Sequence, residues 1–482
     1  MELKPNAVFD YFAQINRVPR PSKHEEKIIA FLQGFARQHN LGCKTDEAGN
    51  VLISKEATPG MTDRATIVLQ AHMDMVCEKT SDKVIDFNND PIETYIDGEW
   101  MRAKGTTLGA DDGIGIAMAM AVLTDKQLRH GPIECLFTRD EETGLTGAEA
   151  IGPGFMTGKY LINLDSEDEG EIFIGCAGGV NTDIDFEYFA QDIPEDYVAL
   201  RIVIDKLTGG HSGDDINKNR ANANKLLARL LYDIQNKYDM NLVSIDGGNL
   251  HNAIPRHAEA VIAVPENSKH EIRSHFNLFA ADIRDEYHTT EPNVEFTMES
   301  VERPDTAIDD ITATALINSL QAVHNGVYEW SQDIAGFVET SSNLASVKMP
   351  EEGKIKIVIS QRSSTKSQLD HLCNVIAATF TLAGADVLIH EGYPGWKPNP
   401  HSTILTLAVD KYKQLFGKEP KVRAIHAGLE CGLFSEKYPH MDMISVGPTL
   451  RGVHSPDECL LIPTVDMVWK HIVAIIEDAP KA

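Results

Sequence analysis

The stretch QAHMDMVCEK at residues 70–79 places two reactive side chains directly after the apolar run TIVL. His72 and Asp74 are two residues apart, so in an extended strand both side chains point to the same face. A strand that ends at the edge of a sheet often carries polar residues of this kind. Whether the pair does chemistry therefore depends on which other side chains the fold brings to it.

Four more polar clusters follow apolar or turn-forming segments, and each has an ordinary local explanation. They are TLGADDG with Asp111 and Asp112, TRDEETG with Glu141 and Glu142, NLDSEDEG with Asp165, and GVHSPDE with His454. Singly, these sequences are typical of a helix N-cap, a strand-exit turn, an acidic loop and a surface histidine. Together they indicate one site, because the carboxyl ends of strands in an open α/β sheet meet at one crevice. Two histidines with several carboxylates are ligands that suit zinc and related divalent ions.

The elements that would position these clusters follow an α/β pattern. Residues 1–40 show the apolar spacing of helices, and the strand-like runs VLIS, TIVLQ, IECLF and YLINL surround the small-residue helix GIGIAMAMAVL. From residue 184 the pattern changes to strands alternating with helices at 220–237, near 268–286, near 307–323 and at 367–383. The segments 175–180 and 391–400 are rich in turn formers and mark the boundaries.

The predicted fold class is therefore α/β, with two domains. Residues 1–183 and 393–482 form a discontinuous domain with a mixed sheet flanked by helices. Residues 184–392 form an inserted α+β domain made of two tandem units.

Composition excludes several functional classes. The formal charge of −28 argues against nucleic-acid binding, which needs clustered cations. No stretch reaches the roughly 20 apolar residues of a membrane span. Seven cysteines without a CxxC motif favour reduced thiols in a cytoplasmic protein.

In this order, HMD, GADDG, EET, the aspartate of NLDSED and the late histidine resemble the signature of dinuclear zinc metallopeptidases of the carnosinase and aminoacylase group. The resemblance covers nearly the whole chain, including the inserted domain, which is about twice the size of the single lid of many relatives. It implies two Zn²⁺ ions per subunit, with Co²⁺ or Mn²⁺ as alternatives. His72 and Asp165 would bind one ion, Glu142 and His454 the other, and Asp111 would bridge them.

The same resemblance implies the roles of two further carboxylates in the first domain. Asp74 would accept the far ring N–H of His72 and so fix its tautomer. Glu141 would act as general base toward a water molecule held by the two metal ions. Adjacent glutamates alternate sides in a regular strand, so this assignment requires a turn at Glu141–Glu142, which Thr143–Gly144 favours.

In the inserted lid domain the resemblance points to residues that contact the substrate. His211 in LTGGHSGDDI would stabilise the oxyanion, in some relatives from a partner subunit. Asn252 in GGNLHNAIPRHAE would bind the peptide, and Arg362 in SQRSS would hold a terminal carboxylate. HAGLECG, with His426 and Glu430, lies where relatives line the rim of the active site, so Glu430 is a further substrate-binding candidate.

The expected function is metal-dependent hydrolysis of unblocked dipeptides, in particular Xaa-His including carnosine, by a cytoplasmic homodimer. One alternative is an N-acyl amino acid deacylase that uses the same metals. Another, from a different class, is a non-catalytic metal- or peptide-binding protein. A third is a thiol enzyme in which Cys77 or Cys431, both beside the expected site, is the nucleophile.

Overall fold

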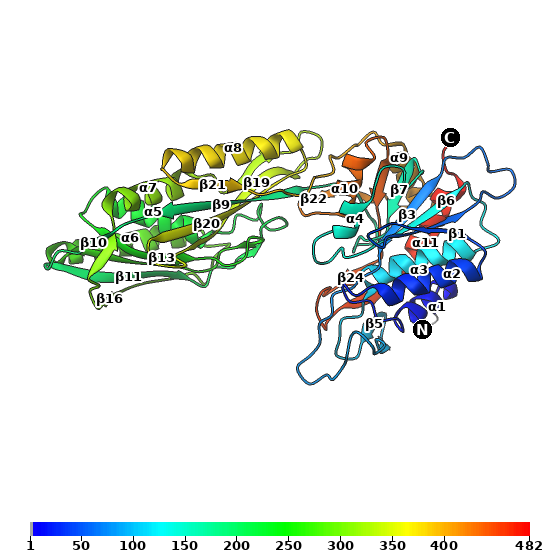
Figure 1. The fold of residues 1–482 in the computed structure, drawn as a ribbon, viewed down its shortest axis with the longest axis horizontal. Helices are drawn as coiled ribbons and strands as arrows, with labels where there is room; N and C mark the ends of the chain where they lie inside the picture. The colour runs from blue at the N-terminus through cyan, green and yellow to red at the C-terminus, as the bar shows by residue number, and fades with distance from the viewer. Residues whose placement is uncertain (1–2) are drawn as a thin grey trace. The chain divides into compact units, whose positions relative to one another are not determined.

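The computed structural model describes residues 3–482, which form two compact units. Unit 1 comprises the chain up to Cys176 together with Trp396–Ala424 and Leu429–Ala482. Unit 2 comprises Ala177–Gly395 and the short segment Ile425–Gly428. Each unit has its own central sheet and its own helices (Figure 1).

The main sheet of unit 1 has eight strands in the order β1-β2-β6-β3-β7-β23-β8-β22. β3 is parallel to β6 and β7, and β7 is parallel to β23, whereas the β1–β2, β2–β6 and β23–β8 pairs are antiparallel. The predicted mixed sheet is therefore confirmed. The strands are β1 (Gly42–Thr45), β2 (Val51–Lys55), β3 (Ile67–His72), β6 (Ile133–Thr138), β7 (Tyr160–Asn163), β8 (Glu171–Cys176), β22 (Lys421–Ile425) and β23 (Asp442–Ser445).

Seven helices accompany this sheet, and α1 packs beside α3 (Figure 1). α1 buries Val8, Phe9, Phe12 and Ile15, the one-sided spacing expected of an amphipathic helix. α3 is buried on almost all sides, which explains its small and apolar sequence GIGIAMAMAVL. The helices are α1 (Asn6–Ile15), α2 (Glu26–Gln38), α3 (Ala110–Thr124), α4 (Thr146–Ala150), α9 (Thr403–Phe416), α10 (Glu430–Lys437) and α11 (Ile462–Glu477).

A second, four-stranded sheet in unit 1 has the order β24-β25-β5-β4. Its strands are β4 (Thr94–Asp97), β5 (Trp100–Ala103), β24 (Leu450–Arg451) and β25 (Cys459–Leu461). β24 and β25 flank the turn that carries His454, so this sheet fixes the C-terminal site segment to the rest of the unit.

Unit 2 is built on a nine-stranded sheet with the path β16-β11-β15-β13-β19-β20-β9-β21, and β18 pairs with β19. The two predicted tandem units thus share one sheet. The strands are β9 (Gly178–Glu187), β11 (Tyr197–Asp205), β13 (Asn241–Gly247), β15 (Ala258–Pro265), β16 (Glu295–Val301), β18 (Gly326–Trp330), β19 (Val338–Lys348), β20 (Lys354–Ser363) and β21 (Asp386–Ile389). Two short pairs join β10 (Ala190–Asp192) to β17 (Thr306–Ile308), and β12 (Gly210–His211) to β14 (Ala253–Ile254).

The four helices predicted for the inserted segment are present in unit 2. They are α5 (Ala223–Gln235), α6 (Lys269–Glu286), α7 (Asp310–Ala322) and α8 (Lys366–Leu382), and a 3₁₀ turn at Glu266–Ser268 precedes α6. α8 packs along β9, β20 and β21 (Figure 1). Leu372, Ile376 and Phe380 of this helix are buried in the same core as the apolar faces of the sheet strands.

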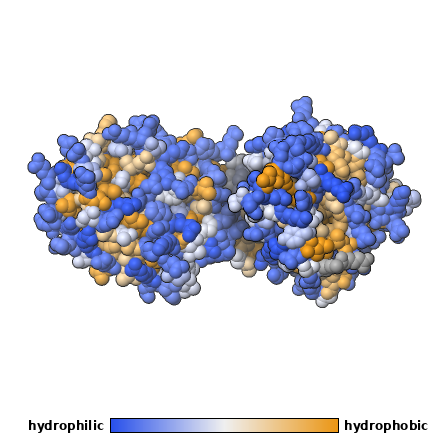
Figure 2. Space-filling view, turned by 90° about the horizontal axis from the view of Figure 1, so that it is seen from below, coloured by the Kyte–Doolittle hydropathy of each residue, from blue (hydrophilic) through white to orange (hydrophobic). Residues whose placement is uncertain are grey.

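The surface of each unit mixes hydrophilic and hydrophobic residues. Figure 2 shows small groups of hydrophobic residues among hydrophilic ones on the visible face of each unit. Among residues 3–482, no helix has the length and apolar character needed to cross a membrane.

Candidate metal and catalytic site

The first group of site residues lies at or just after the ends of three neighbouring parallel strands of unit 1, β6, β3 and β7. His72 is the last residue of β3 and pairs in register with Thr138 at the end of β6, three residues before Glu141. Gln70 on β3 pairs with Asn163, the last residue of β7, and Asp165 follows two residues later. The carboxyl ends of these strands therefore lie together, as expected for an open α/β sheet.

Asp111, at the start of α3, lies between two imidazoles. Its Oδ1 atom is 2.9 Å from Nε2 of His72, and its Oδ2 atom is 3.2 Å from Nε2 of His454. The two oxygens of one carboxylate thus face two different histidines. Nε2 of His72 is also 3.5 Å from Asp165, and Nε2 of His454 is 3.0 Å from Glu142.

These contacts define two sets of potential metal ligands that share Asp111. His72, Asp111 and Asp165 form one set, and Asp111, Glu142 and His454 form the other, with the ligand atoms of each set within 4.8 Å of one another. Oε1 of Glu142 is buried and has no hydrogen-bond partner among residues 3–482, so this carboxylate has an oxygen available for a cation. Imidazole and carboxylate donors in this arrangement fit two divalent metal ions.

The pKa values of the potential ligands show how strongly these side chains interact with one another when no cation is bound. Hydrogen bonds to Asp111 and Glu142 raise the pKa of His454 to about 11. Burial raises the pKa of Asp165 to about 7. Burial alone would lower the pKa of His72, but Asp165, Asp111 and Asp74 raise it well above its ordinary value. Protons are thus held among these ligand atoms, and a metal ion must displace them in order to bind.

Asp74 lies behind His72 and contacts the loop that carries the two glutamates. Its Oδ1 atom is 3.3 Å from Nδ1 of His72, on the side of the ring away from Asp111. The same carboxylate accepts hydrogen bonds from the backbone N–H groups of Glu141 (3.0 Å) and Glu142 (3.2 Å). Ser22 donates a further hydrogen bond of 2.7 Å, and Asp74 is fully buried. Asp74 therefore lies beside the far ring nitrogen of His72, as expected, but no hydrogen bond is formed at Nδ1 among the described residues, so the role of Asp74 in fixing the tautomer stays a prediction.

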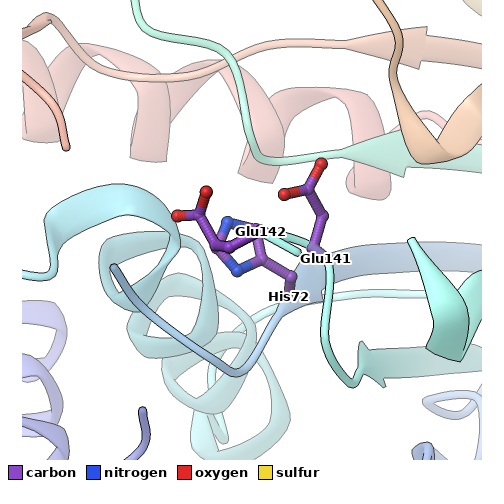
Figure 3. A group of neighbouring side chains, drawn as sticks. All are labelled: His72, Glu141 and Glu142. Carbon is purple, nitrogen blue, oxygen red and sulfur yellow. The ribbon is translucent and has the colours of Figure 1, made fainter. Parts of the chain in front are cut away.

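The required turn after β6 is also present. The N–H groups of Gly144 and Leu145 donate to the carbonyl of Glu141, at 3.2 and 3.0 Å. After this turn, the side chains of Glu141 and Glu142 both lie beside the His72 imidazole (Figure 3). One ligand atom of each of these three residues lies within 4.8 Å of the others, so Glu141 also stands close to the potential metal ligands. Burial raises the pKa of Glu141 well above its ordinary value. A carboxylate of this kind accepts a proton more readily than a solvated glutamate.

The structure distinguishes the two aspartates of GADDG, which sequence alone leaves equivalent in chemistry. Asp112 turns its Oδ1 atom back to the N–H of Gly115, 3.1 Å away, and so caps α3. Asp111 instead faces His72 and His454. The backbone of both aspartates is non-helical, which allows their side chains to point in different directions at the start of α3.

Glu430 is buried behind the strand ends that carry the site residues and is not exposed at the surface. It is fully buried at the start of α10, where its Oε2 atom accepts hydrogen bonds from Gln70 (2.5 Å) and Thr138 (2.8 Å). Burial raises its pKa to about 8. Gln70 lies on β3, which ends at His72, and Thr138 ends β6, which leads to Glu141. The contacts seen for Glu430 therefore hold together the ends of the two strands that position these residues. Its direct contact with substrate stays a prediction.

The two cysteines near the site are poor nucleophiles. Burial raises the pKa of Cys77 to about 11 and that of Cys431 well above its ordinary value. A thiol attacks as its thiolate, so both residues are mostly protonated and unreactive near neutral pH. All seven cysteines are free thiols, as expected from the sequence.

The lid candidates belong to unit 2, where a cationic group and several histidines lie near one another. Arg362, at the end of β20, is mostly buried and donates a 2.9 Å hydrogen bond to the hydroxyl of Tyr393. Burial and then Arg362 lower the pKa of His211, and the same two causes lower the pKa of His426 to about 3. Asn252 is exposed, and its backbone carbonyl accepts a 2.8 Å hydrogen bond from the N–H of Ser212.

His211 has a defined tautomer in this environment. Its Nδ1 atom accepts the N–H groups of Gly213 (3.3 Å) and Asp214 (3.2 Å). The proton of the neutral ring therefore lies on Nε2, which is the atom left to donate a hydrogen bond.

Two buried charged residues outside the predicted set, Glu458 and Arg20, contact the backbone of the site. Glu458 lies four residues after His454, which was the only sequence signal that it belongs near the site. Arg20 lies 53 to 89 residues from the three carbonyls that it contacts, and no local pattern marks it.

Comparison with known proteins places this geometry in a family. The sequence profile of peptidase family M20/M25/M40 matches residues 68–478. The cytosol non-specific dipeptidase of Escherichia coli (strain K12) is 40% identical over 479 residues, which are 99% of each chain. The crystal structure of aminoacylhistidine dipeptidase from Vibrio alginolyticus matches with a TM-score of 0.95 and 41% identity, over 100% of this chain and 98% of that one.

A more distant structure shares the fold alone. Aminopeptidase PepT from Bacillus cereus matches with a TM-score of 0.57 and 17% identity, over 99% of both chains. The family profile covers most of the chain, and the full-length dipeptidase relative exceeds one third identity. The chain therefore belongs to peptidase family M20/M25/M40.

Proposed function

We propose that this metallopeptidase is a dipeptidase that hydrolyses unblocked dipeptides, among them Xaa-His and carnosine, at a dinuclear metal site. The observation that carries the proposal is the position of Asp111, whose two oxygens face His72 and His454 at 2.9 and 3.2 Å. The names of the full-length relatives support the substrate class, since one is a non-specific dipeptidase and another an aminoacylhistidine dipeptidase.

In this proposal His72 and Asp165 would hold one metal ion, Glu142 and His454 would hold the other, and Asp111 would be shared between the two sets. Zinc is the proposed metal because imidazole and carboxylate ligands suit it, and Co²⁺ or Mn²⁺ can use the same donors. When bound, the two ions supply Lewis acidity, which polarises the scissile carbonyl and acidifies a coordinated water molecule.

Glu141 is the proposed general base. Its carboxylate removes a proton from the attacking water and then donates that proton to the nitrogen of the leaving amine. Burial raises its pKa, which favours proton uptake, and its carboxylate lies beside His72 and the proposed ligand Glu142, close to where the water would be held. One glutamate is thus free to carry the proton while its neighbour binds metal.

Three residues of unit 2 are proposed to contact the substrate. Arg362 holds the C-terminal carboxylate, because a guanidinium can donate two parallel hydrogen bonds to a carboxylate. His211 donates a hydrogen bond from Nε2 to the oxyanion. Its Nδ1 atom accepts hydrogen bonds from two backbone N–H groups, which leaves the ring proton on Nε2. Asn252 binds the peptide group of the substrate through its exposed side chain.

The proposal includes a cytoplasmic homodimer. The cytosolic location follows the name of the E. coli relative. Light scattering coupled to size-exclusion chromatography measures the assembly directly, and a mass of one chain would contradict the dimer.

A metal analysis combined with a substrate panel tests the proposed function. Purified protein is assayed for metal content and then for hydrolysis of carnosine, other Xaa-His dipeptides, unrelated dipeptides, N-acetylated dipeptides and N-acetyl amino acids. We expect about two metal ions per chain, turnover of dipeptides with a free amino group, loss of activity after chelation, and recovery when Zn²⁺ or Co²⁺ is restored. Turnover of N-acetyl amino acids alone would replace the dipeptidase with a deacylase. Full activity of the chelated protein would refute the metal mechanism.

A further inference from the structure

The carboxylate of Glu458 is surrounded by four consecutive backbone N–H groups. Its Oε2 atom accepts from Leu108 (2.7 Å) and Gly109 (2.9 Å), and its Oε1 atom accepts from Ala110 (2.8 Å) and Asp111 (3.3 Å). Glu458 is almost fully buried, with 2% of its surface exposed. A buried charge is costly unless it is fully hydrogen-bonded, so the burial of this carboxylate depends on its four hydrogen bonds to residues 108–111.

The contacted loop leads directly into α3 and ends at Asp111. Gly109 has a φ of 67°, the left-handed conformation that glycine adopts without strain, and Asp111 has non-helical backbone angles. The four N–H groups also lie at the N-terminus of α3, where the helix dipole favours an anion. Glu458 thus provides, from a distant segment, the acceptors for these four N–H groups, while Asp112 accepts the N–H of Gly115 one turn further on.

Arg20 holds the same loop from its carbonyl side. One guanidinium nitrogen donates to the carbonyl of Gly109, and the other donates to the carbonyl of Asp74 at 2.6 Å. Arg20 is almost fully buried, with 1% of its surface exposed. It therefore joins the loop of Asp111 to the segment just beyond His72.

Glu458 also belongs to the turn that carries His454. Its own N–H donates to the carbonyl of Ser455 at 3.1 Å, and the hydroxyl of Ser455 donates to the carbonyl of Gly452 at 2.7 Å. His454 has a φ of 59° and a half-exposed side chain, so little packing holds its ring in place. The contact between Glu458 and residues 108–111 consequently ties the turn of His454 to the loop of Asp111.

We propose that Glu458 and Arg20 are positioning residues that fix Asp111 between His72 and His454, and so set the geometry of the dinuclear site. The inference rests on the proposed role of Asp111 as the shared ligand. Neither residue binds metal or substrate. Both act through the backbone of residues 108–111, which determines where the two oxygens of Asp111 lie.

The test compares Glu458→Gln with a matched control, Glu134→Gln. Glu134 on β6 is also buried, and its carboxylate accepts the N–H groups of Thr157 (2.9 Å) and Gly158 (3.2 Å), away from the metal ligands. Glutamine at 458 would turn an NH₂ group toward backbone donors and disrupt the contact. Since loss of residues that orient metal ligands typically costs about 10- to 100-fold in metal affinity, we expect that loss for Glu458→Gln and wild-type affinity for Glu134→Gln.

The measurements are metal affinity by competition with a chromogenic chelator, the visible absorption spectrum of the Co²⁺-loaded protein, and steady-state kinetics at saturating metal. Glu458→Gln should change the cobalt spectrum and lower kcat with little change in KM. Arg20→Lys should show the same changes, because one ammonium group cannot span both carbonyls. Glu458→Asp keeps the charge and should lose less than Glu458→Gln, and it serves as the second variant if glutamine prevents folding.

Asp111→Asn separates failure of this inference from failure of the proposed function. If Asp111→Asn loses metal while Glu458→Gln and Arg20→Lys keep wild-type affinity and spectrum, the positioning role is refuted and the dinuclear site stands. If Asp111→Asn keeps both metals at full affinity, the shared-ligand assignment fails, and the inference fails with it.

Discussion

Nδ1 of His72 lies 3.3 Å from Oδ1 of Asp74, while Nε2 on the opposite side of the same ring lies 2.9 Å from Asp111. One ring nitrogen therefore faces a buried carboxylate, and the other faces the proposed metal ligands. Asp74 also accepts the N–H groups of Glu141 and Glu142, so one side chain contacts the loop of the two glutamates and lies beside the histidine that we propose it orients. This arrangement explains why the strand ends on the sequence HMD.

Asp74→Asn should reduce kcat/KM and metal affinity by about 10- to 100-fold, because the amide can donate to Nδ1 of His72 and favour the wrong tautomer. Metal competition and steady-state kinetics measure both effects. Asp46→Asn is the control, since Asp46 accepts the N–H groups of Gly49 and Asn50, at 2.9 Å each, in a turn apart from the ligands. Equal losses in the two variants would show that Asp74 has only a structural role.

Glu141→Gln and Glu142→Gln should fail in different ways. We expect Glu141→Gln to retain both metals and to lose about 100-fold or more of kcat, because a general base typically contributes a factor of this order. Glu142→Gln should instead lose affinity for one metal and recover part of its activity at high metal concentration. Unchanged hydrolysis by metal-loaded Glu141→Gln would disprove the assignment of the base.

Glu430 should make the metal-free protein less stable as the pH rises. Its folded-state pKa of about 8 lies above the ordinary value of 4.5, so between these pH values the folded state holds a proton that the unfolded chain has released. The stabilisation is complete below about pH 4.5 and is lost as the pH rises through about 8. At about 1.4 kcal/mol per pKa unit the change is on the order of a few kcal/mol.

Glu430→Gln removes this titration and should raise stability relative to the wild type at pH 8 more than at pH 5. Urea unfolding of the chelated proteins at both pH values measures the difference. The same stability difference at pH 5 and pH 8 would mean that Glu430 does not titrate in this range.

Arg362→Met should raise KM for dipeptides by about 10- to 100-fold, since a hydrogen bond to a charged group contributes about 1.5–3 kcal/mol. The same variant should treat dipeptide amides, which lack the terminal carboxylate, much as the wild type does. Arg201→Met is the control, because Arg201 forms ion pairs with Glu259 and Glu299 on an exposed face of the unit 2 sheet. A uniform loss on acids and amides would indicate that Arg362 supports the fold instead of holding the carboxylate.

Much of the fold could be predicted from the sequence because its signals are local. The apolar runs before His72 and Glu141 are strands whose residues are all buried, and the small-residue run after Asp112 is a buried helix. The shorter elements could not be predicted in this way. α4 and α10 have five and eight residues, which is too few for a clear helical period.

The sequence by itself determined that imidazoles and carboxylates follow the ends of strands, because strand periodicity and chain direction are encoded locally. The family resemblance selected Asp111 over Asp112, but the chemistry of the two residues is the same, and the tertiary structure shows which of them faces the two histidines, because that depends on backbone angles at the start of α3. The tertiary structure also revealed Glu458 and Arg20, whose partners lie 347 to 350 and 53 to 89 residues away along the chain. Hydrogen bonds over such separations depend on which distant segments the fold brings together, so no local pattern encodes them.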